Sequence, residues 1–322
     1  MLNTIKTPIE KEMAHFDSYF KGQFTADVKL LHDALKYVCD GVGKTMRPML
    51  VMLVAKSLGG ANERTYAAAS AMEMLHTASL LHDDVIDESD KRRGRHSLNV
   101  VFNNNVAVLA GDYLFSLSLK NAAETMDHRI IKEISKLGTA LAAGEVLQVE
   151  LQRSGEYNEE NYLKVISYKT SSLFMCCAAC GAYTAGADEE VVERYKKFGE
   201  YVGNCFQIKD DIFDYFSNDV GKPTGSDMRE GKITIPAIYV LENSSNPLLQ
   251  PIRAKIAASE ILDENEIKAL IDIAVNEGGI EYANSMIERF RNLALEQLPT
   301  DMPQDVRDAL LAYIDFTIKR NK

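Results

Sequence analysis

Apolar residues recur every three or four positions along most of this chain, and the pattern breaks mainly at glycine and proline. Such spacing places apolar side chains on one face of an α-helix, and no convincing alternating strand pattern is found. The predicted helices cover residues 9–20, 25–39, 46–58, 63–89, 106–126, 129–152, 159–185, 189–217, 230–242, 265–279, 281–297 and 304–319. Because no low-complexity linker or short-period repeat separates them, the sequence predicts an all-α fold, a single large antiparallel helical bundle that forms one domain over residues 1–322.

Composition and net charge limit the kinds of ligand that the chain is expected to bind. The chain has 322 residues, of which 46% are hydrophobic and 26% charged, so it is long enough and apolar enough to bury a sizeable core. Its formal net charge is −11, which disfavours nucleic acid and anionic lipid as partners. Any anionic ligand must therefore be held by local cations or by metal.

Five cysteines and no apolar leader predict a reducing, cytoplasmic location. Cys177 and Cys180 have the spacing of a zinc or redox pair. They lie in an apolar helical segment, with no second pair and no nearby histidine, so we interpret them as small core residues. No apolar run reaches the roughly 18 residues that a transmembrane helix needs.

The first acidic cluster, Asp83, Asp84 and Asp87, follows the strongly apolar stretch 71–81. Asp83 and Asp87 are four residues apart, so both lie on one helix face, about one turn apart. Partly buried carboxylates need a cation, because otherwise burial shifts their pKa. Mg²⁺ fits this role, since it prefers oxygen ligands and is commonly shared between one or two carboxylates and substrate phosphates.

The second acidic cluster, Asp210, Asp211 and Asp214, repeats the spacing of the first. A single cluster of this kind is often only an exposed acidic helix face. Two copies, each embedded in an apolar helix, favour a shared function. Facing one another across a cavity, they would hold two or three Mg²⁺ ions around a diphosphate, and the metal would assist departure of that group.

Three basic sites supply candidate cations for a diphosphate in this acidic chain. They contain Lys44 with Arg47, Arg92 with Arg93, and Lys222 with Lys232. Each taken alone is also consistent with a solvated loop. The glycine and lysine at 43–44 do not form a Walker A loop, because the upstream glycine is missing and no strand precedes them. His76 lies two turns before Asp83 on the same helix face, and a binding or a packing role both stay open for it. His82 points elsewhere and is interpreted as structural.

The ordered motifs resemble those of the trans-isoprenyl (polyprenyl) diphosphate synthases over about residues 40 to 240. The matching pieces are Gly43-Lys44-x-x-Arg47-Pro48, Leu81-His82-Asp83-Asp84-x-x-Asp87, Arg92-Arg93-Gly94, Gly144-Glu145-x-x-Gln148, Lys169-Thr170, and Phe206-Gln207-x-x-Asp210-Asp211-x-x-Asp214 followed by Gly221-Lys222. The resemblance implies the isoprenoid synthase type I fold, with a central active-site cavity, and a homodimer. It also implies a magnesium-dependent prenyltransferase that joins isopentenyl diphosphate to an allylic diphosphate and releases pyrophosphate.

The resemblance also implies roles for single residues. Direct metal ligands would be Asp83, Asp87 and Asp210, with Asp84, Asp211 and Asp214 in or near the surrounding shell. The isopentenyl diphosphate site would contain Lys44, Arg47, His76 and Arg93. Cations for the allylic diphosphate would be Arg92, Lys169, Lys222 and Lys232. The allylic cation would be stabilised by Thr170, Gln207 and the carbonyl of Lys169, and the departing pyrophosphate would accept the proton.

The size of the product depends on the wall beside the first acidic cluster. The growing tail is expected to run along the helix that carries Asp83, so residues one turn and more before it form the wall. These wall residues are Ala78, Ser79, Leu75 and Met72, with Ala122 from the neighbouring helix. Because none is aromatic, we predict a C30–C50 product of the medium- and long-chain branch. The alternative is a short-chain farnesyl or geranylgeranyl diphosphate synthase, with these small residues serving only helix packing.

Two rival functions make different use of the same residues. A class I terpene cyclase would have no use for the isopentenyl diphosphate cations Lys44, Arg47 and Arg93, and its second metal site normally mixes Asn, Ser or Thr with Glu. A non-catalytic subunit of a heteromeric synthase would tend to lose aspartates, whereas this chain keeps all six. A synthase consumes isopentenyl diphosphate, and neither rival does so alone.

Overall fold

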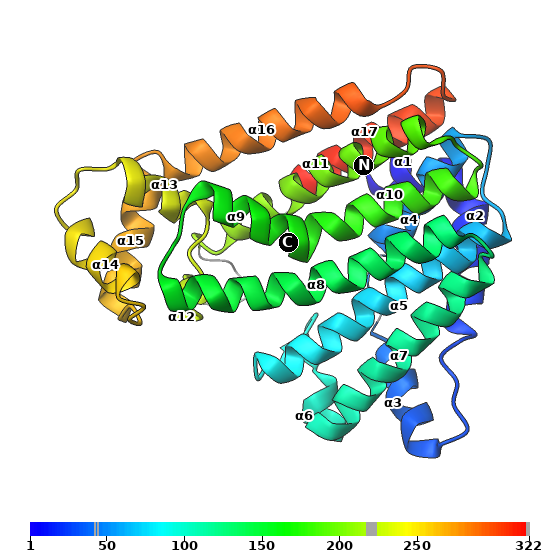
Figure 1. Ribbon diagram of the computed structural model, residues 1–322, viewed down its shortest axis with the longest axis horizontal. Helices are drawn as coiled ribbons and strands as arrows, with labels where there is room; N and C mark the ends of the chain where they lie inside the picture. Colours follow the sequence, from blue (N-terminus) through cyan, green and yellow to red (C-terminus); the bar gives the residue numbers. More distant parts are fainter. Residues whose placement is uncertain (42, 44, 217–223, 320–322) are drawn as a thin grey trace. The chain divides into compact units, whose positions relative to one another are not determined.

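The computed structural model describes residues 1–41, 43, 45–216 and 224–319 (Figure 1). The described residues group into two compact units. The first comprises residues 1–138, 173–197 and 298–313, and the second comprises 139–172, 198–297 and 314–319, with the undescribed positions left out of each. The single domain over 1–322 stays a prediction.

Helices dominate both units. The first unit contains α1 (Leu2–Lys6), η1 (Thr7–Ile9), α2 (Glu10–Lys21), α3 (Lys29–Cys39), α4 (Met46–Ser57), α5 (Glu63–Ile86), α6 (Leu98–Phe102), α7 (Asn104–Glu124) and most of α10 (Ser172–Thr184). The second contains α9 (Glu159–Ile166), η2 (Ser167–Ser171), α12 (Ser226–Arg229), α13 (Ile235–Asn243), α14 (Leu249–Ala257), α15 (Glu264–Asn276) and α16 (Gly279–Gln297). Three helices contribute residues to both units: α8 (His128–Ser154), α11 (Glu189–Phe213) and α17 (Gln304–Lys319). The all-α prediction is confirmed.

The structure corrects several details of the predicted elements. Strands β1 (Lys91–Arg92) and β2 (Arg95–His96) form an antiparallel hairpin that the sequence did not predict, because two-residue strands are too short to show alternation. The helix predicted over 159–185 is interrupted by the π-helical turn η2. The helix predicted over 230–242 begins only at Ile235, with proline in its first turn. The short helices α6, α12 and α14 were not predicted.

The core of the first unit is built around α5. A capping box at Asn62 starts this helix, because the Asn62 side chain accepts hydrogen bonds from the N–H groups of Arg64 and Thr65. Helices α5 and α7 lie side by side (Figure 1). The Ser118 hydroxyl on α7 donates to the carbonyl of Ala71 on α5 at 2.7 Å. This packing holds the end of α5, where the first acidic cluster lies.

The core of the second unit fixes the direction of the last turns of α11. Ile208 and Ile212 are buried in one cluster with Ile235 and Ile238 of α13 and further apolar residues of α15 and α16. Asp210, between them on the same helix, is exposed. A buried apolar face therefore turns Asp210 toward the surface of this unit.

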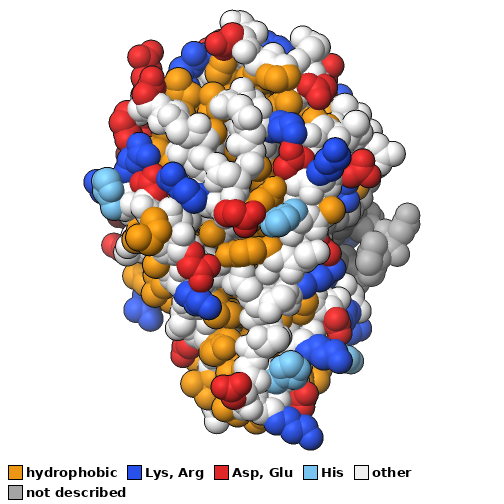
Figure 2. All heavy atoms as spheres, turned by 90° about the vertical axis from the view of Figure 1, so that its right-hand side faces the viewer, with side chains coloured by type: hydrophobic (Ala, Val, Ile, Leu, Met, Phe, Trp, Pro, Cys, Tyr) orange, Lys and Arg blue, Asp and Glu red, His pale blue; other side chains and the backbone are white. Residues whose placement is uncertain are grey.

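All five cysteines are free thiols, and Cys176, Cys177, Cys180 and Cys205 are buried. Their interpretation as core residues is confirmed. None of the described helices is long and apolar enough to cross a membrane. On the face shown in Figure 2, acidic and basic side chains are interspersed with hydrophobic ones, so that face carries no large patch of a single charge.

Candidate active site

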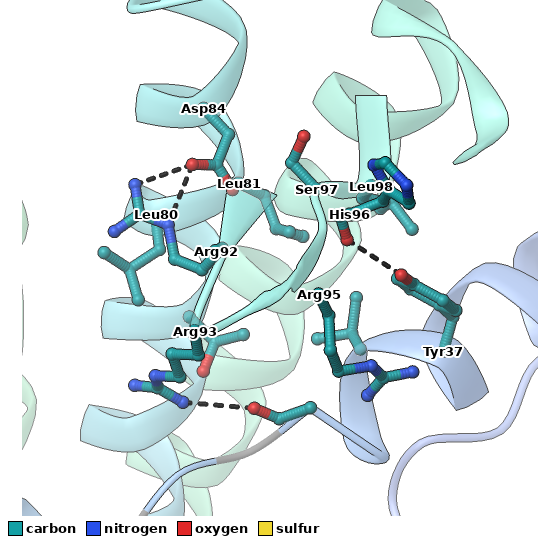
Figure 3. A pocket seen from close by; sticks show the side chains of 13 residues that line it. Tyr37, Leu80, Leu81, Asp84, Arg92, Arg93, Arg95, His96, Ser97 and Leu98 are labelled. Atoms are coloured by element: carbon teal, nitrogen blue, oxygen red, sulfur yellow. Dashed lines mark hydrogen bonds and ion pairs between the residues drawn. The ribbon is translucent and has the colours of Figure 1, made fainter. Parts of the chain in front are cut away.

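The first acidic cluster occupies the last turns of α5. Asp84 is buried, and its carboxylate forms an ion pair with Arg92, whose Nη2 and Nε lie 2.6 and 2.8 Å from Oδ1 (Figure 3). Asp83 is half-buried, and Asp87 is exposed at the end of the helix. Asp83 and Asp87 are thus left facing outward while Asp84 binds the hairpin. Their roles as direct and indirect metal ligands stay predictions.

The hairpin β1–β2 brings two of the predicted basic sites together. Arg93 follows β1 with φ 52°, in the left-handed region, and its Nη1 donates to the carbonyl of Gly41 at 3.2 Å. A Cβ atom added to Gly43 would lie 2.8 Å from the Arg93 guanidinium, so the end of that side chain passes close to the Gly43 backbone. Arg93 therefore packs on the loop that precedes α4. Lys44, in the same loop, lies outside the described residues.

Arg47, His76 and Arg93 gather into one basic cluster. Burial lowers the pKa of His76 well below its usual value, and the positive charges of Arg47 and Arg93 lower it further. The His76 imidazole is therefore neutral near pH 7. The Arg47 guanidinium lies 6.0 Å from the ring centre of Phe174. The structure thus assembles three of the four residues predicted to bind isopentenyl diphosphate.

A pocket lies between α3, α5 and the hairpin (Figure 3). Its lining combines apolar residues such as Leu80 and Leu98 with the guanidinium groups of Arg92, Arg93 and Arg95. The Arg95 guanidinium stacks over the Tyr37 ring at 4.4 Å, and the Tyr37 hydroxyl donates to the carbonyl of His96 at 2.8 Å. These contacts fix the hairpin, and with it Arg92 and Arg93, against α3.

The second acidic cluster has a different environment. Asp211 is buried, and its carboxylate accepts hydrogen bonds at 2.7 Å from the Tyr162 hydroxyl and from Nε2 of Gln207. Burial raises the pKa of Asp211 to about 8, and the nearby charge of Asp227 adds to this effect. The Thr170 hydroxyl in turn donates to Oε1 of Gln207 at 2.6 Å. A hydrogen-bonded chain therefore joins Asp211 to two predicted cation-stabilising residues.

The Asp214 carboxylate accepts hydrogen bonds at the start of α12. Its Oδ1 accepts hydrogen bonds from the Ser226 N–H at 3.0 Å and from the Ser226 hydroxyl at 2.7 Å. Its Oδ2 accepts from the N–H of Asp227 at 3.1 Å. Both oxygens thus hold the start of α12, so the third aspartate of this cluster organises the segment leading to Lys232.

A π-helical turn presents Lys169 and Thr170. Such turns are rare and occur often at functional sites. The Lys169 ammonium contacts Oε1 of Glu145 at 2.8 Å and donates to Gln148 at 2.8 Å, both on α8. A Cβ atom added to Gly144 would lie 2.7 Å from Cγ of Lys169, so only glycine allows α8 to pass this closely. Part of the Gly144-Glu145-x-x-Gln148 motif therefore serves to hold Lys169.

The remaining predicted residues have various surroundings. Lys232 is half-buried and forms an ion pair with Glu230 at 2.5 Å, while Lys222 lies outside the described residues. His82 contacts Gly111 of α7, which confirms its packing role. The predicted chain-length wall is largely buried, since Met72, Leu75, Ala78 and Ala122 are at most 3% exposed and Ser79 is half-buried. Their role as a wall stays a prediction.

Two positioning residues were missed from the sequence. Tyr162 holds Asp211 but lies 49 positions away, and no local pattern links the two. Glu73 is buried on α5 beside the basic cluster. In the sequence, Glu73 could have been recognised as a charged residue within the apolar stretch 71–81.

The donor chemistry of both clusters fits Mg²⁺. Carboxylate oxygens are its preferred protein ligands, and Asp83, Asp87 and Asp210 present theirs at partly or fully exposed positions. Within the part of the chain that the structure describes, no group of three or more His, Cys, Asp or Glu side chains gathers closely enough to hold a metal ion.

Comparison with known proteins gives consistent results. A match to the polyprenyl synthetase family covers residues 28–274. The octaprenyl diphosphate synthase of Escherichia coli K12 is 30% identical over 100% of this chain and 99% of its own length. The solved geranylgeranyl pyrophosphate synthase of Bacteroides thetaiotaomicron gives a TM-score of 0.85 at 40% identity, covering 99% of each chain. A polyprenyl synthase from Caulobacter crescentus CB15, complexed with calcium and isoprenyl diphosphate, gives a TM-score of 0.90 at 27% identity, covering 100% of this chain and 98% of the other.

These matches span both acidic clusters and all three predicted basic sites. The fold inferred from the helical pattern and the enzyme class inferred from the ordered motifs are confirmed. The chain belongs to the polyprenyl synthetase family, and it is a prenyltransferase.

Proposed function

We propose that this protein is an all-trans-polyprenyl diphosphate synthase that condenses isopentenyl diphosphate head-to-tail with an allylic diphosphate. The observation that carries this proposal is the basic cluster of Arg47, Arg93 and neutral His76, on and beside the helix that bears the first acidic cluster. A diphosphate substrate without metal bridging needs such fixed cations. A terpene cyclase, which uses no isopentenyl diphosphate, does not account for it.

The residues of this chain would act on two diphosphates. Arg47, Arg93 and His76, with Lys44, would bind isopentenyl diphosphate, while Arg92, Lys169, Lys222 and Lys232 would contact the allylic diphosphate. Asp83, Asp87 and Asp210 would hold two or three Mg²⁺ ions, which neutralise charge on the allylic diphosphate as it departs. A neutral His76 suits its place, because it donates a hydrogen bond without adding a further charge beside two arginines.

The proposed reaction needs no protein side chain to act as the base. The bond between C1 and oxygen of the allylic diphosphate breaks, and pyrophosphate leaves with the electron pair. The double bond of isopentenyl diphosphate forms the new carbon–carbon bond, and a proton then passes to the departed pyrophosphate. Thr170, Gln207 and the carbonyl of Lys169 would stabilise the cation, and the contact of Thr170 with Gln207 at 2.6 Å supports their acting together.

The predicted product is C30–C50, since small residues line the predicted wall and the octaprenyl diphosphate synthase of Escherichia coli is similar over the full chain. A geranylgeranyl diphosphate synthase is the second candidate. The 40% identity to the enzyme of that name from Bacteroides thetaiotaomicron favours it. Both candidates consume the same substrates, so the length of the product is what distinguishes them.

A homodimer is the assembly we propose. Helix α7 carries exposed apolar residues at helical spacing, among them Val108, Phe115 and Leu119, on a protein of net charge −11. An exposed apolar stripe of this kind is typical of a protein interface. We place the enzyme in the cytoplasm, because all five cysteines are free.

The test incubates the purified protein with Mg²⁺, farnesyl diphosphate and labelled isopentenyl diphosphate, and sizes the dephosphorylated products. A ladder ending at C30 or above is expected. Replacement of Ser79 by phenylalanine is expected to stop the ladder at C15 to C20 because the ring fills the tunnel, whereas Ser79→Ala should leave it unchanged. A C20 product from the parent would select the geranylgeranyl candidate. No incorporation would favour a non-catalytic subunit.

A further inference from the structure

Glu73 is a buried acid in the middle of an apolar helix. It lies on α5, three residues before His76, and its side chain is 2% exposed. Among the described residues, none donates a hydrogen bond to its Oε2. Burying a carboxylate in this way costs several kcal/mol unless a nearby cation compensates it. The position therefore requires an electrostatic partner.

The partners are the arginines of the basic cluster. Burial raises the pKa of Glu73, and the charges of Arg47 and Arg93 oppose that effect. Arg47 lacks a partner of the opposite kind, because its Nε is buried without a hydrogen-bond acceptor among the described residues. Partial burial lowers the pKa of Arg93, the charge of Glu73 counteracts this, and Arg47 lowers it further. The charge of one buried carboxylate thus acts on two guanidinium groups that repel each other.

Two other ionisable side chains near this cluster, those of Tyr313 and Cys177, are neutral. Tyr313 is fully buried, and burial raises the pKa of its hydroxyl, which donates to the carbonyl of Met46 at 3.0 Å. Burial likewise raises the pKa of the Cys177 thiol well above its usual value, so that group is neutral. Arg47 also lies in the first turn of α4, where the helix dipole disfavours a cation.

We propose that Glu73 is a positioning residue of the isopentenyl diphosphate site, whose buried negative charge holds the guanidinium groups of Arg47 and Arg93 in place for the substrate diphosphate. The inference rests on the proposed function, since it assigns these arginines to that substrate. Without the carboxylate, the two like charges and the start of α4 repel one another. The arginines then turn toward solvent, and the site must be reassembled each time the substrate binds.

The experiment measures binding without turnover. Isopentenyl diphosphate is titrated calorimetrically, with no allylic substrate present, into the parent, Glu73→Gln and Glu73→Met. Both variants remove the charge, and methionine also fits an apolar core, so at least one is expected to fold. The dissociation constant should rise roughly tenfold or more in each, as for outer partners of other charged sites. In steady-state assays, KM for isopentenyl diphosphate should rise while kcat and the KM for farnesyl diphosphate stay near the parent values.

Glu133→Gln is the matched control. Glu133 is also a buried acid of the first unit, but it pairs with Lys136 and Lys196, away from the basic cluster. Its substitution should lower the thermal midpoint without changing the affinity for isopentenyl diphosphate. A folded Glu73 variant that binds this substrate as tightly as the parent, or more tightly, would overturn the inference. A parent that binds none of it would instead contradict the proposed function.

Discussion

The two acidic clusters share one sequence pattern but differ in what surrounds their middle aspartate. Asp84 in the first unit is 3% exposed and forms an ion pair with Arg92. Asp211 in the second unit is 5% exposed, and its carboxylate accepts hydrogen bonds from two neutral donors, Tyr162 and Gln207. The first buried charge is therefore neutralised by the protein itself, while the second is only hydrogen-bonded.

This difference shows that the motif does not determine the ionisation of its members. Burial raises the pKa of Asp211 to about 8 and that of Asp227, which lies nearby, to about 6. Near pH 7 the raised pKa favours a neutral Asp211 carboxyl, and the following variants test how the two buried aspartates differ.

The largest expected effect is on catalysis. Replacing Asp83 or Asp210 by alanine should each lower kcat/KM by about 10³-fold, because either change removes a carboxylate that stabilises charge in the transition state. The two losses should agree within about tenfold despite the different surroundings. Asp90→Ala, an exposed acid just after the first cluster, should behave like the parent. Near-parent activity in either variant would remove that aspartate from the metal site.

The next effect is on stability and belongs to the first cluster alone. Asp84→Asn leaves Arg92 without its buried partner and should lower the free energy of unfolding by about 2 kcal/mol. Breaking a fully buried pair costs about 3 to 5 kcal/mol, and this estimate is reduced because the Arg92 side chain is 37% exposed. Urea unfolding measures the change. The exposed pair of Lys21 and Asp17 is the control, and Asp17→Asn should cost less than about 0.5 kcal/mol.

Much of the site was predictable from local spacing. Helical periodicity placed the first and last aspartates of each cluster on one face, and the order of the motifs indicated the family. What linked them in space was not local. The pairing of Tyr162 with Asp211 and the packing of Arg93 on Gly43 depend on tertiary contacts between residues 49 and 50 positions apart, and no periodic signal spans such distances.

Other features were hidden by short length or by position. The strands of β1–β2 have two residues each, fewer than any alternation needs. Helix α14 contains Pro251 in its first turn, where proline is tolerated, so a proline in the sequence does not exclude a helix at that point. The π-helical turn at Lys169 was missed because it arises within a continuous helical pattern. In each case the local pattern was compatible with more than one backbone, and packing selected among them.

The smallest expected effect concerns pH and belongs to the second cluster alone. In the metal-free protein, the folded-state pKa of Asp211 lies well above the ordinary value of 3.8. Between about pH 4 and pH 8, Asp211 therefore stays protonated in the folded state but is ionised in the unfolded chain. Stability from this group is fully present below about pH 4 and is lost as the pH rises to about 8. Asp211→Asn keeps a neutral side chain, so its unfolding free energy should fall less over this window.

Chemical unfolding in the presence of a chelator, at several pH values between 4 and 8, measures the contrast. Parent and Asp211→Asn should converge near pH 4, and the variant should become the more stable of the two near pH 8. Asp84→Asn is the matched comparison, because it removes the ion pair with Arg92 and the variant should be less stable than the parent at pH 7. If Asp211→Asn were also destabilised at pH 7 and above, the second buried carboxylate would have to be charge-balanced in the metal-free protein, and the two clusters would be alike.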